Sequence, residues 1–276
     1  MRQLRNYYSK GKKGERNISD SKGRISIVGI GPGNLDYLTP AAKDAIEDSE
    51  IVIGYKTYLE FVHDLIEDAE VLSSGMRREV DRCDKAVDLA LEGNKVAVIC
   101  SGDPGIYAMA GLVLEIAKGK GQSAEGQDKL LPIEVIPGVS ALNASAARLG
   151  APLMHDFASI SMSDLLTPWE LIEKRLEAAA SADFVIAIYN PKSKGRQEHI
   201  GKARDIILKF RSPDTPVGIV RAATRDDEKI VITDLNRMLE NEIDMQSTVI
   251  IGNSQTFTWE GRMITPRGYQ EKYKLE

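Results

Sequence analysis

Short apolar runs alternate with segments of helical periodicity through the first half of the chain. Four runs rich in β-branched residues are expected to form strands, at 25–30, 51–55, 96–100 and 133–136. Each run is almost continuously apolar, which is typical of strands buried on both faces of a sheet. Because strands and helices alternate, this half predicts a parallel sheet with flanking helices.

Capping residues indicate where several helices begin or end. Thr39-Pro40 fits an N-cap followed by proline at the first helical position. Apolar residues at helical spacing run from Val80 to Leu91, and Gly93 suits the C-terminal cap of that helix. Thr167-Pro-Trp-Glu170 has the pattern of a capping box, so Thr167 is expected to cap another helix.

The second half contains a similar number of strand-like runs but fewer helices. Strands are expected at 184–189, 217–220, 230–233 and 248–251, with helices near 197–210 and 234–240. This shortage of helices predicts a mixed, partly antiparallel sheet. We therefore expect an α/β protein with a flexible tail at 1–23, an N-terminal α/β domain at 24–138 and a C-terminal α/β domain at 139–276.

Charge is distributed unevenly along the 276 residues. The first 24 hold eight basic and two acidic residues, so the remaining chain holds 28 basic and 39 acidic residues. An acidic body argues against binding to nucleic acid, because phosphates need clustered cations. The basic segment is expected to be a solvated tail, with a tether to an anionic partner as the alternative.

Composition also excludes several kinds of site. No apolar run approaches the ~20 residues that a membrane-spanning helix needs. Two cysteines and three histidines leave little scope for a metal centre or an iron–sulfur cluster, and none is expected. The basic start lacks the apolar segment of a signal peptide, which together with the few cysteines predicts a cytoplasmic protein.

Three of the predicted parallel strands end in loops of small residues. These loops are Gly29-Ile-Gly-Pro-Gly33, Ser101-Gly-Asp-Pro104 and Pro137-Gly-Val-Ser140. Open parallel sheets bind ligands at the carboxyl ends of their strands, and small residues let a ligand approach the backbone. The first loop differs from the dinucleotide fingerprint, because Asn34 stands where the third glycine is required. Tight turns without a ligand are the alternative interpretation.

Taken together, these three motifs resemble the tetrapyrrole methylase superfamily, in consistent order over about residues 24–268. A stretch at 150–170, containing His155-Asp156, is similar to the precorrin-3B or cobalt-factor III C17-methyltransferases, and so is Ile188-Tyr-Asn-Pro191. The resemblance implies two α/β domains with S-adenosylmethionine in the cleft between them. It also implies methyl transfer to C17 of a tetrapyrrole with ring contraction, in cobalamin biosynthesis, and a homodimer.

The resemblance further implies roles for individual residues. The expected acid–base residue is His155, oriented by Asp156 or Asp164, and the expected substrate contacts are Gly31, Ser161 and Arg221. The expected cofactor contacts are Pro32, Ser101, Gly102, Asp103, Ile106, Ser140, Ala141, Tyr189 and Ala223.

A substrate with many carboxylates needs cations, and several candidates follow predicted strands. These are Lys56, Arg77, Arg78, Lys192, Lys194, Arg196, Arg221 and Arg225. Alternatives remain open at this point: a C11 or C20 tetrapyrrole methylase, a related methyltransferase acting on RNA or protein, or a binding protein without chemistry. The resemblance covers both a cobalt-containing and a metal-free substrate.

Overall fold

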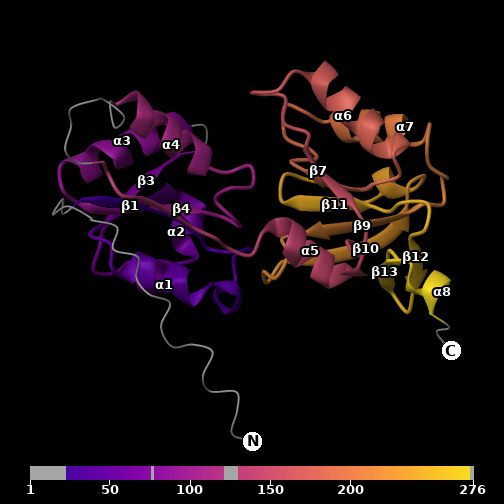
Figure 1. Cartoon of the computed structure of the whole chain (residues 1–276), viewed down its shortest axis with the longest axis horizontal. Coiled ribbons are helices and arrows are strands. Elements are labelled where there is room, and N and C mark those ends of the chain that lie inside the picture. Colours follow the sequence, from indigo (N-terminus) through magenta and orange to yellow (C-terminus); the bar gives the residue numbers. More distant parts are fainter. Residues whose placement is uncertain (1–22, 76–77, 121–129, 274–276) are drawn as a thin grey trace, which may run out of the picture.

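The computed structural model of the protein describes residues 23–75, 78–120 and 130–273. The predicted tail, apart from Gly23, and the candidate cation Arg77 lie outside the described residues. Two lobes lie side by side, each built around its own sheet (Figure 1). Lobe one denotes the described residues up to 136, and lobe two denotes residues 141–273.

Lobe one contains five strands. They are β1 (Arg24–Gly29), β2 (Ile51–Tyr55), β3 (Glu70–Ser74), β4 (Lys95–Cys100) and β5 (Ile133–Ile136). They pair in the order β3-β2-β4-β1-β5, and every pair is parallel. Their carboxyl ends therefore meet along one edge of the sheet.

Helices cover both faces of this sheet. They are η1 (Leu35–Tyr37), α1 (Pro40–Glu47), α2 (Lys56–Glu60), η2 (His63–Leu65), α3 (Glu79–Leu91) and α4 (Ala110–Gly119). Val96 and Val98 of β4 pack in the same cluster as α3 and α4, whereas Ala97 and Ile99 pack with α1 and α2. This alternation explains why the central strands read as continuous apolar runs.

Lobe two contains a second five-stranded sheet. Its strands are β7 (Phe157–Ser161), β8 (Val185–Tyr189), β9 (Pro216–Arg221), β10 (Lys229–Asp234) and β11 (Ser247–Ile251). The order is β10-β9-β11-β8-β7, with β7 and β8 parallel and the other pairs antiparallel. The carboxyl ends of β7, β8 and β9 share one edge with the start of β11.

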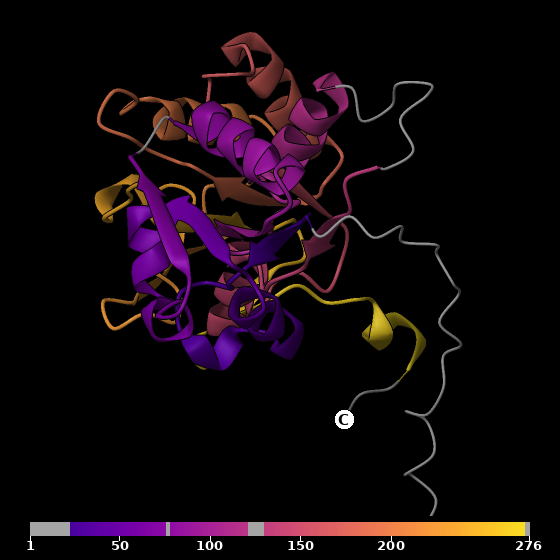
Figure 2. The ribbon, with the colours of Figure 1, turned by 90° about the vertical axis from the view of Figure 1, so that its left-hand side faces the viewer.

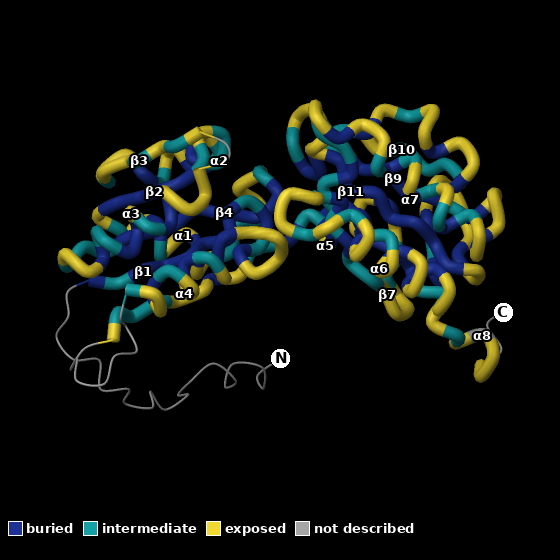
Figure 3. Tube along the Cα trace, turned by 90° about the horizontal axis from the view of Figure 1, so that it is seen from above, coloured by how far each residue is buried: buried dark blue, intermediate teal, exposed yellow. Residues whose placement is uncertain are grey.

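The second sheet is also covered on both faces. Helices α6 (Trp169–Ser181) and α7 (His199–Ile207), with η3 (Met238–Glu240), pack on one face, and α5 (Ala141–Leu149) packs on the other. Figures 1 and 2 show α3, α4, α6 and α7 on the same side of the two sheets. In each lobe the buried residues follow the central strands (Figure 3).

A small three-stranded sheet completes lobe two. It contains β6 (Gly150–Ala151), β12 (Phe257–Trp259) and β13 (Arg262–Ile264), and is followed by α8 (Tyr269–Lys272). No helix in the described part of the chain is long and apolar enough to cross a membrane.

The parallel and mixed sheets confirm the predicted fold class. Thr39 caps α1 as expected, since its hydroxyl accepts a hydrogen bond from Ala42 N at 3.1 Å. The predicted cap at Thr167 is wrong, because Pro168 occupies the N-cap of α6 without a side-chain hydrogen bond. The predicted helix at 234–240 is also wrong, because Asp234 ends β10 and only η3 follows.

Candidate functional site

The three small-residue loops meet at the carboxyl edge of the lobe-one sheet. Gly31 and Gly102 form a two-way backbone bridge, with Gly102 N donating to Gly31 O at 2.7 Å and Gly31 N donating to Gly102 O at 3.2 Å. Gly138, in the third loop, lies against the same carbonyl of Gly102. The loops after β1, β4 and β5 therefore form one junction, which we call the glycine junction.

Side-chain size is restricted at this junction by backbone atoms. A Cβ on Gly138 would lie 2.2 Å from Gly102 O and 2.6 Å from Gly29 O, and a Cβ on Gly29 would lie 2.6 Å from Gly102 O. Gly31 and Gly102 also adopt positive φ angles of 74° and 67°, which glycine tolerates best. The glycines thus let the three loops contact one another, as expected if glycine at the first turn lets another backbone approach closely.

Asp103 holds the junction together. One carboxylate oxygen accepts a hydrogen bond from Gly105 N at 2.8 Å, and the other accepts from Gly138 N at 3.2 Å. The side chain therefore closes its own turn and also links the loop after β4 to the loop after β5. The sequence allows two roles for Asp103, a contact with the ligand and the closing of its own turn. The hydrogen bonds to Gly105 N and Gly138 N show the turn-closing role.

Tyrosines connect this edge to lobe two. The Tyr107 hydroxyl donates to Ser159 O of β7 at 2.9 Å, and its ring lies 5.0 Å from the ring of Tyr189 at the end of β8. The Tyr189 hydroxyl accepts from Leu142 N in the first turn of α5, while Ser140 caps that helix through Asn143 N. The predicted cofactor residues Ile106, Ser140, Ala141 and Tyr189 therefore lie around one contact between the lobes.

Arg225 makes a second contact between the lobes. It follows β9, and its Nε donates to Pro32 O at 2.7 Å in the loop after β1. Its guanidinium also lies 4.7 Å from the centre of the Phe61 ring. Burial lowers the pKa of Arg225, but a guanidinium stays charged at neutral pH. This contact brings Pro32 and Gly33 next to the loop that carries Ala223.

Strained backbone lies in the loops that bring the two lobes together. Six non-glycine residues of the described chain have positive φ, and four of them lie in the loops after β4, β8 and β9. These four are Tyr107, Asn190, Ala222 and Thr224. A β-branched residue at φ 67° is a marked outlier, and the buried Thr224 Oγ1 has no hydrogen-bond partner. Such strain with an orphaned polar atom is typical of ligand sites.

The structure separates the predicted acid–base residues. His155 and Asp156 precede β7, at the amino end of the strand, where Asp156 O accepts from Val185 N. Asp164 follows the opposite end of β7. A five-residue strand spans roughly 16 Å, so Asp164 does not orient His155. His155 instead contacts Asp156, whose backbone N lies 2.8 Å from His155 Nδ1.

Asp164 has a different histidine as its partner. His199, the first residue of α7, places Nε2 3.1 Å from Asp164 Oδ2, and Arg196 Nη1 lies 3.5 Å from Asp164 Oδ1. Burial acts to raise the pKa of Asp164, but its own backbone N–H and its interactions with His199 and Arg196 outweigh that effect and lower the pKa. Sequence reasoning missed His199, because it lies 35 residues from Asp164 and outside any recognised motif.

The predicted substrate residues have partners within the chain. Ser161 Oγ accepts from Asn190 Nδ2 at 3.0 Å, at the edge that carries Tyr189. Arg221 donates to Asp244 and Asp227, both at 2.8 Å, so its charge is already compensated. Among the other candidate cations that the structure describes, Lys56, Lys192 and Lys194 have no recorded ion pair, whereas Arg78 pairs with Asp81 at 3.7 Å.

Replacing Arg221 by methionine is expected to destabilise the fold at pH 7 far more than at pH 3. Hydrogen bonding to Arg221 lowers the pKa of Asp227. For Asp244 burial acts to raise the pKa, but hydrogen bonds from Arg221, Gln246 N and Ser247 together outweigh it and lower the pKa. A lowered carboxyl pKa gives stability that is present above about pH 4 and is lost as pH falls through the folded-state pKa. Urea denaturation of both proteins at the two pH values measures this. An equal loss at both would contradict the ion-pair explanation.

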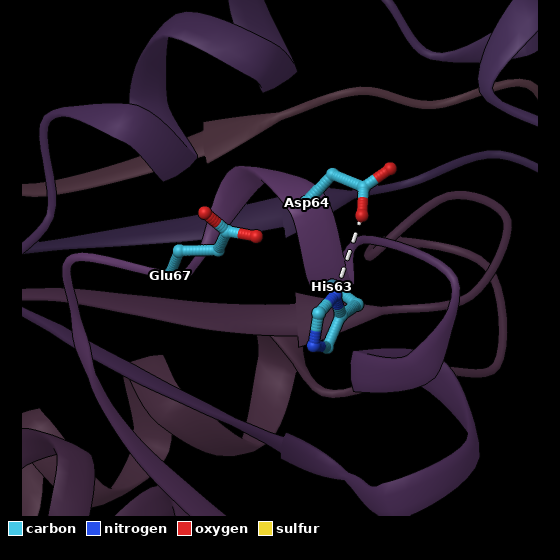
Figure 4. Close-up of side chains that lie close together, drawn as sticks. All are labelled: His63, Asp64 and Glu67. Carbon is cyan, nitrogen blue, oxygen red and sulfur yellow. Dashed lines mark hydrogen bonds and ion pairs between the residues drawn. The ribbon is translucent and has the colours of Figure 1, made fainter.

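Among the described residues, one cluster of possible metal ligands and two cavities include none of the predicted cofactor residues. His63, Asp64 and Glu67 bring their ligand atoms within 4.8 Å of one another, but all three are exposed (Figure 4), and exposed acidic groups commonly lie close together without binding an ion. Cavities of about 230 Å³ beside Arg211 and about 360 Å³ beside α7 both lie outside the glycine junction.

Neither cysteine of the chain is placed for nucleophilic chemistry. Both thiols are free and buried: Cys83 lies on the buried face of α3, and Cys100 is the last residue of β4. Burial raises the pKa of Cys83 to about 12 and that of Cys100 to about 11. Since the thiolate is the reactive form, these residues act as packing groups in lobe one.

Comparisons with known proteins agree on one family. A family model for tetrapyrrole (corrin/porphyrin) methylases matches residues 24–239. The chain is 54% identical over 254 residues to the cobalt-factor III methyltransferase of Priestia megaterium. The aligned residues make up 92% of this chain but only 46% of that protein, so the chain spans about half of that relative's length. It is 49% identical over 245 residues to the probable cobalt-factor III C(17)-methyltransferase of Salmonella typhimurium, covering 89% and 99%. The solved structure of the methyltransferase CobJ aligns with a TM-score of 0.83 at 34% identity, covering 88% of this chain and 100% of that one.

Proposed function

The chain belongs to the tetrapyrrole methylases, and from that membership we propose that it methylates C17 of precorrin-3B or its cobalt form, with ring contraction, in cobalamin biosynthesis. The observation that carries this proposal is the glycine junction, whose loops contact lobe two through Tyr107 and Tyr189 and through Pro32 and Arg225. The similarity to two proteins named for cobalt-factor III supports the choice of substrate and carbon.

We propose that S-adenosylmethionine is the methyl donor, as in this family. The residues present fit such a ligand: small loops, a strained backbone and the unpartnered Thr224 Oγ1 lie where the two lobes meet. The groups proposed to hold the cofactor are Pro32, Ser101, Gly102, Asp103, Ile106, Ser140, Ala141, Tyr189 and Ala223. When bound, the sulfonium supplies an already activated methyl group, so the main task of the chain is alignment.

The acid–base work of ring contraction is proposed to fall to Asp164. It follows β7 on the edge that carries Ser161 and Tyr189, whereas His155 lies at the opposite end of that strand. Its lowered pKa keeps the carboxylate ionised at neutral pH, so in the free protein it is a weak base that can accept a hydrogen bond or a proton from the substrate. His199 and Arg196 fix the position of its two oxygens.

Mass spectrometry with isotopically labelled S-adenosylmethionine tests the proposed activity. Purified protein is incubated with precorrin-3B or cobalt-factor III, and the product is expected to gain one labelled methyl group at C17 and to have a contracted ring. The unlabelled donor serves as the control. Methylation at another carbon, such as C11 or C20, would refute the assigned position, and no gain with either substrate would refute the function.

The working form of the protein is a further part of the proposal. We propose a cytoplasmic homodimer that does not bind nucleic acid, with residues 24–138 and 139–276 as its two domains. The excess of acidic residues supports the lack of nucleic-acid binding, and two free, buried cysteines suit a reducing compartment.

A further inference from the structure

Arg82 is a buried cation that lacks a carboxylate partner among the described residues. Three arginines of the described chain are buried, and the other two pair with acids: Arg196 with Asp164, and Arg211 with Asp183. Arg82 is only 5% exposed and forms no ion pair within 4.0 Å with any residue that the structure describes. Burying an uncompensated charge is costly, so such a group points to a missing anion.

Neutral groups surround the guanidinium of Arg82. Its Nε donates to Ser74 Oγ at 2.9 Å and its Nη2 donates to Gly75 O at 3.2 Å. Its Nη1 contacts only the thioether sulfur of Met109 at 3.3 Å, and a thioether is a weak acceptor. Nε and Nη2 therefore donate to oxygen acceptors, whereas Nη1 donates to a weak sulfur acceptor that a carboxylate oxygen could replace.

Arg82 lies on the ligand-binding side of lobe one. Ser74 ends β3, and Met109 precedes α4 after the loop of β4, so the guanidinium bridges the carboxyl ends of these strands. Its field reaches Tyr58: burial raises the pKa of this phenol, while the positive charges of Arg225 and Arg82 act to lower it. Arg225 of lobe two and Arg82 of lobe one thus both act on this phenol.

Carboxylates at this edge are already engaged elsewhere. Asp103 uses both oxygens on backbone N–H groups, so it does not compensate Arg82. We propose that Arg82 binds a carboxylate of a ligand at the carboxyl edge of the lobe-one sheet, with Nη1 leaving the Met109 sulfur for a carboxylate oxygen. Methionine has three rotatable bonds, so the Met109 side chain can move aside without disturbing α4.

This inference rests on the proposed function, which supplies two sources of carboxylate. One is the amino-acid part of S-adenosylmethionine, and the other is a side arm of the tetrapyrrole. Both would present the same chemistry to a guanidinium, which binds carboxylates through charge-assisted hydrogen bonds. The two sources are separable by measuring the binding of each ligand alone.

The test compares Arg82→Gln and Arg82→Lys with the unaltered full chain. Calorimetry measures the Kd of S-adenosylhomocysteine, and quenching of porphyrin fluorescence measures the Kd of uroporphyrin III, a stable polycarboxylate probe. Arg82→Gln is expected to weaken one of the two by about tenfold or more, the loss typical of one hydrogen bond between charged groups. Arg82→Lys should recover part of that loss because it keeps the positive charge.

Arg211→Gln is the matched control, since it removes a buried arginine at the far edge of lobe two. It is expected to lower the melting temperature and to leave both Kd values unchanged. Weaker binding of S-adenosylhomocysteine assigns the cofactor carboxylate, and weaker binding of uroporphyrin III assigns a side arm. If Arg82→Gln leaves the Kd of both ligands unchanged, the inference is wrong. If Arg82→Gln does not fold, the same conclusion follows from unchanged Kd values for both ligands in Arg82→Lys. Because both ligands are measured without turnover, a failure here is distinct from a failure of the proposed reaction.

Discussion

Replacing Gly138 by alanine is expected to cost about 3 kcal/mol or more of the free energy of unfolding and to abolish binding of S-adenosylhomocysteine. The added methyl group would lie 2.2 Å from Gly102 O and 2.6 Å from Gly29 O, far inside contact distance. Both obstacles are backbone atoms, which cannot rotate away as a side chain can. The three loops would have to separate, and the glycine junction would lose its shape. Chemical denaturation and calorimetry measure the two effects.

Gly111→Ala provides the control for this change. Gly111 lies in α4, and a Cβ there would meet nothing within 4 Å. Alanine should therefore stabilise this helix by roughly 0.5–1 kcal/mol and leave ligand binding unchanged. If Gly138→Ala bound S-adenosylhomocysteine as well as the unaltered protein does, the glycine junction would not be part of the cofactor site.

Removing the carboxylate of Asp103 is expected to have the second-largest effect. Asp103→Ala leaves Gly105 N and Gly138 N without their acceptors, and hydrogen bonds to charged groups contribute about 1.5–3 kcal/mol each. The loop after β4 would no longer be tied to the loop after β5. A misplacement of about 1 Å in a positioning loop can reduce turnover about a hundredfold, so kcat/KM for methyl transfer should fall by that order.

Asp103→Asn separates bonding from charge in this experiment. Asparagine keeps one acceptor oxygen, so it should retain one of the two hydrogen bonds and show an intermediate loss of both stability and kcat/KM. Circular dichroism melts and steady-state rates on the three proteins would rank them. An alanine variant as active as the unaltered protein would show that the two loops hold their positions without Asp103.

The central architecture could be predicted because burial leaves a strong pattern in the sequence. Strands β1, β2 and β4 are apolar on both faces, and the predicted ranges match them within one residue. The edge strands β3 and β7 escaped prediction because glutamate and serine residues interrupt their apolar runs. The edge strands β5 and β10 were predicted, because their runs are mostly apolar, so an edge position alone does not hide a strand from this reasoning.

The candidate site was only partly predictable, because several of its contacts join residues that lie far apart in the sequence. The loop residues stand next to strands that the pattern identifies, so Gly102, Asp103 and Ser140 were found together. The pairing of Asp164 with His199, and of Arg225 with Pro32, depends on how distant segments pack. No local pattern records that His155 lies at the opposite end of β7 from Asp164.

Because the two native thiols are buried, introduced cysteines can be labelled selectively to measure the distance between the lobes. With pKa values of about 12 and about 11, almost none of Cys83 or Cys100 is thiolate at pH 7, so maleimide reagents should leave both unmodified. Cysteines introduced at the exposed Lys56 and Lys194 would then be the reactive thiols, one on each lobe. Fluorophores attached there would report the distance between the lobes as ligands bind, with the native cysteines left in place.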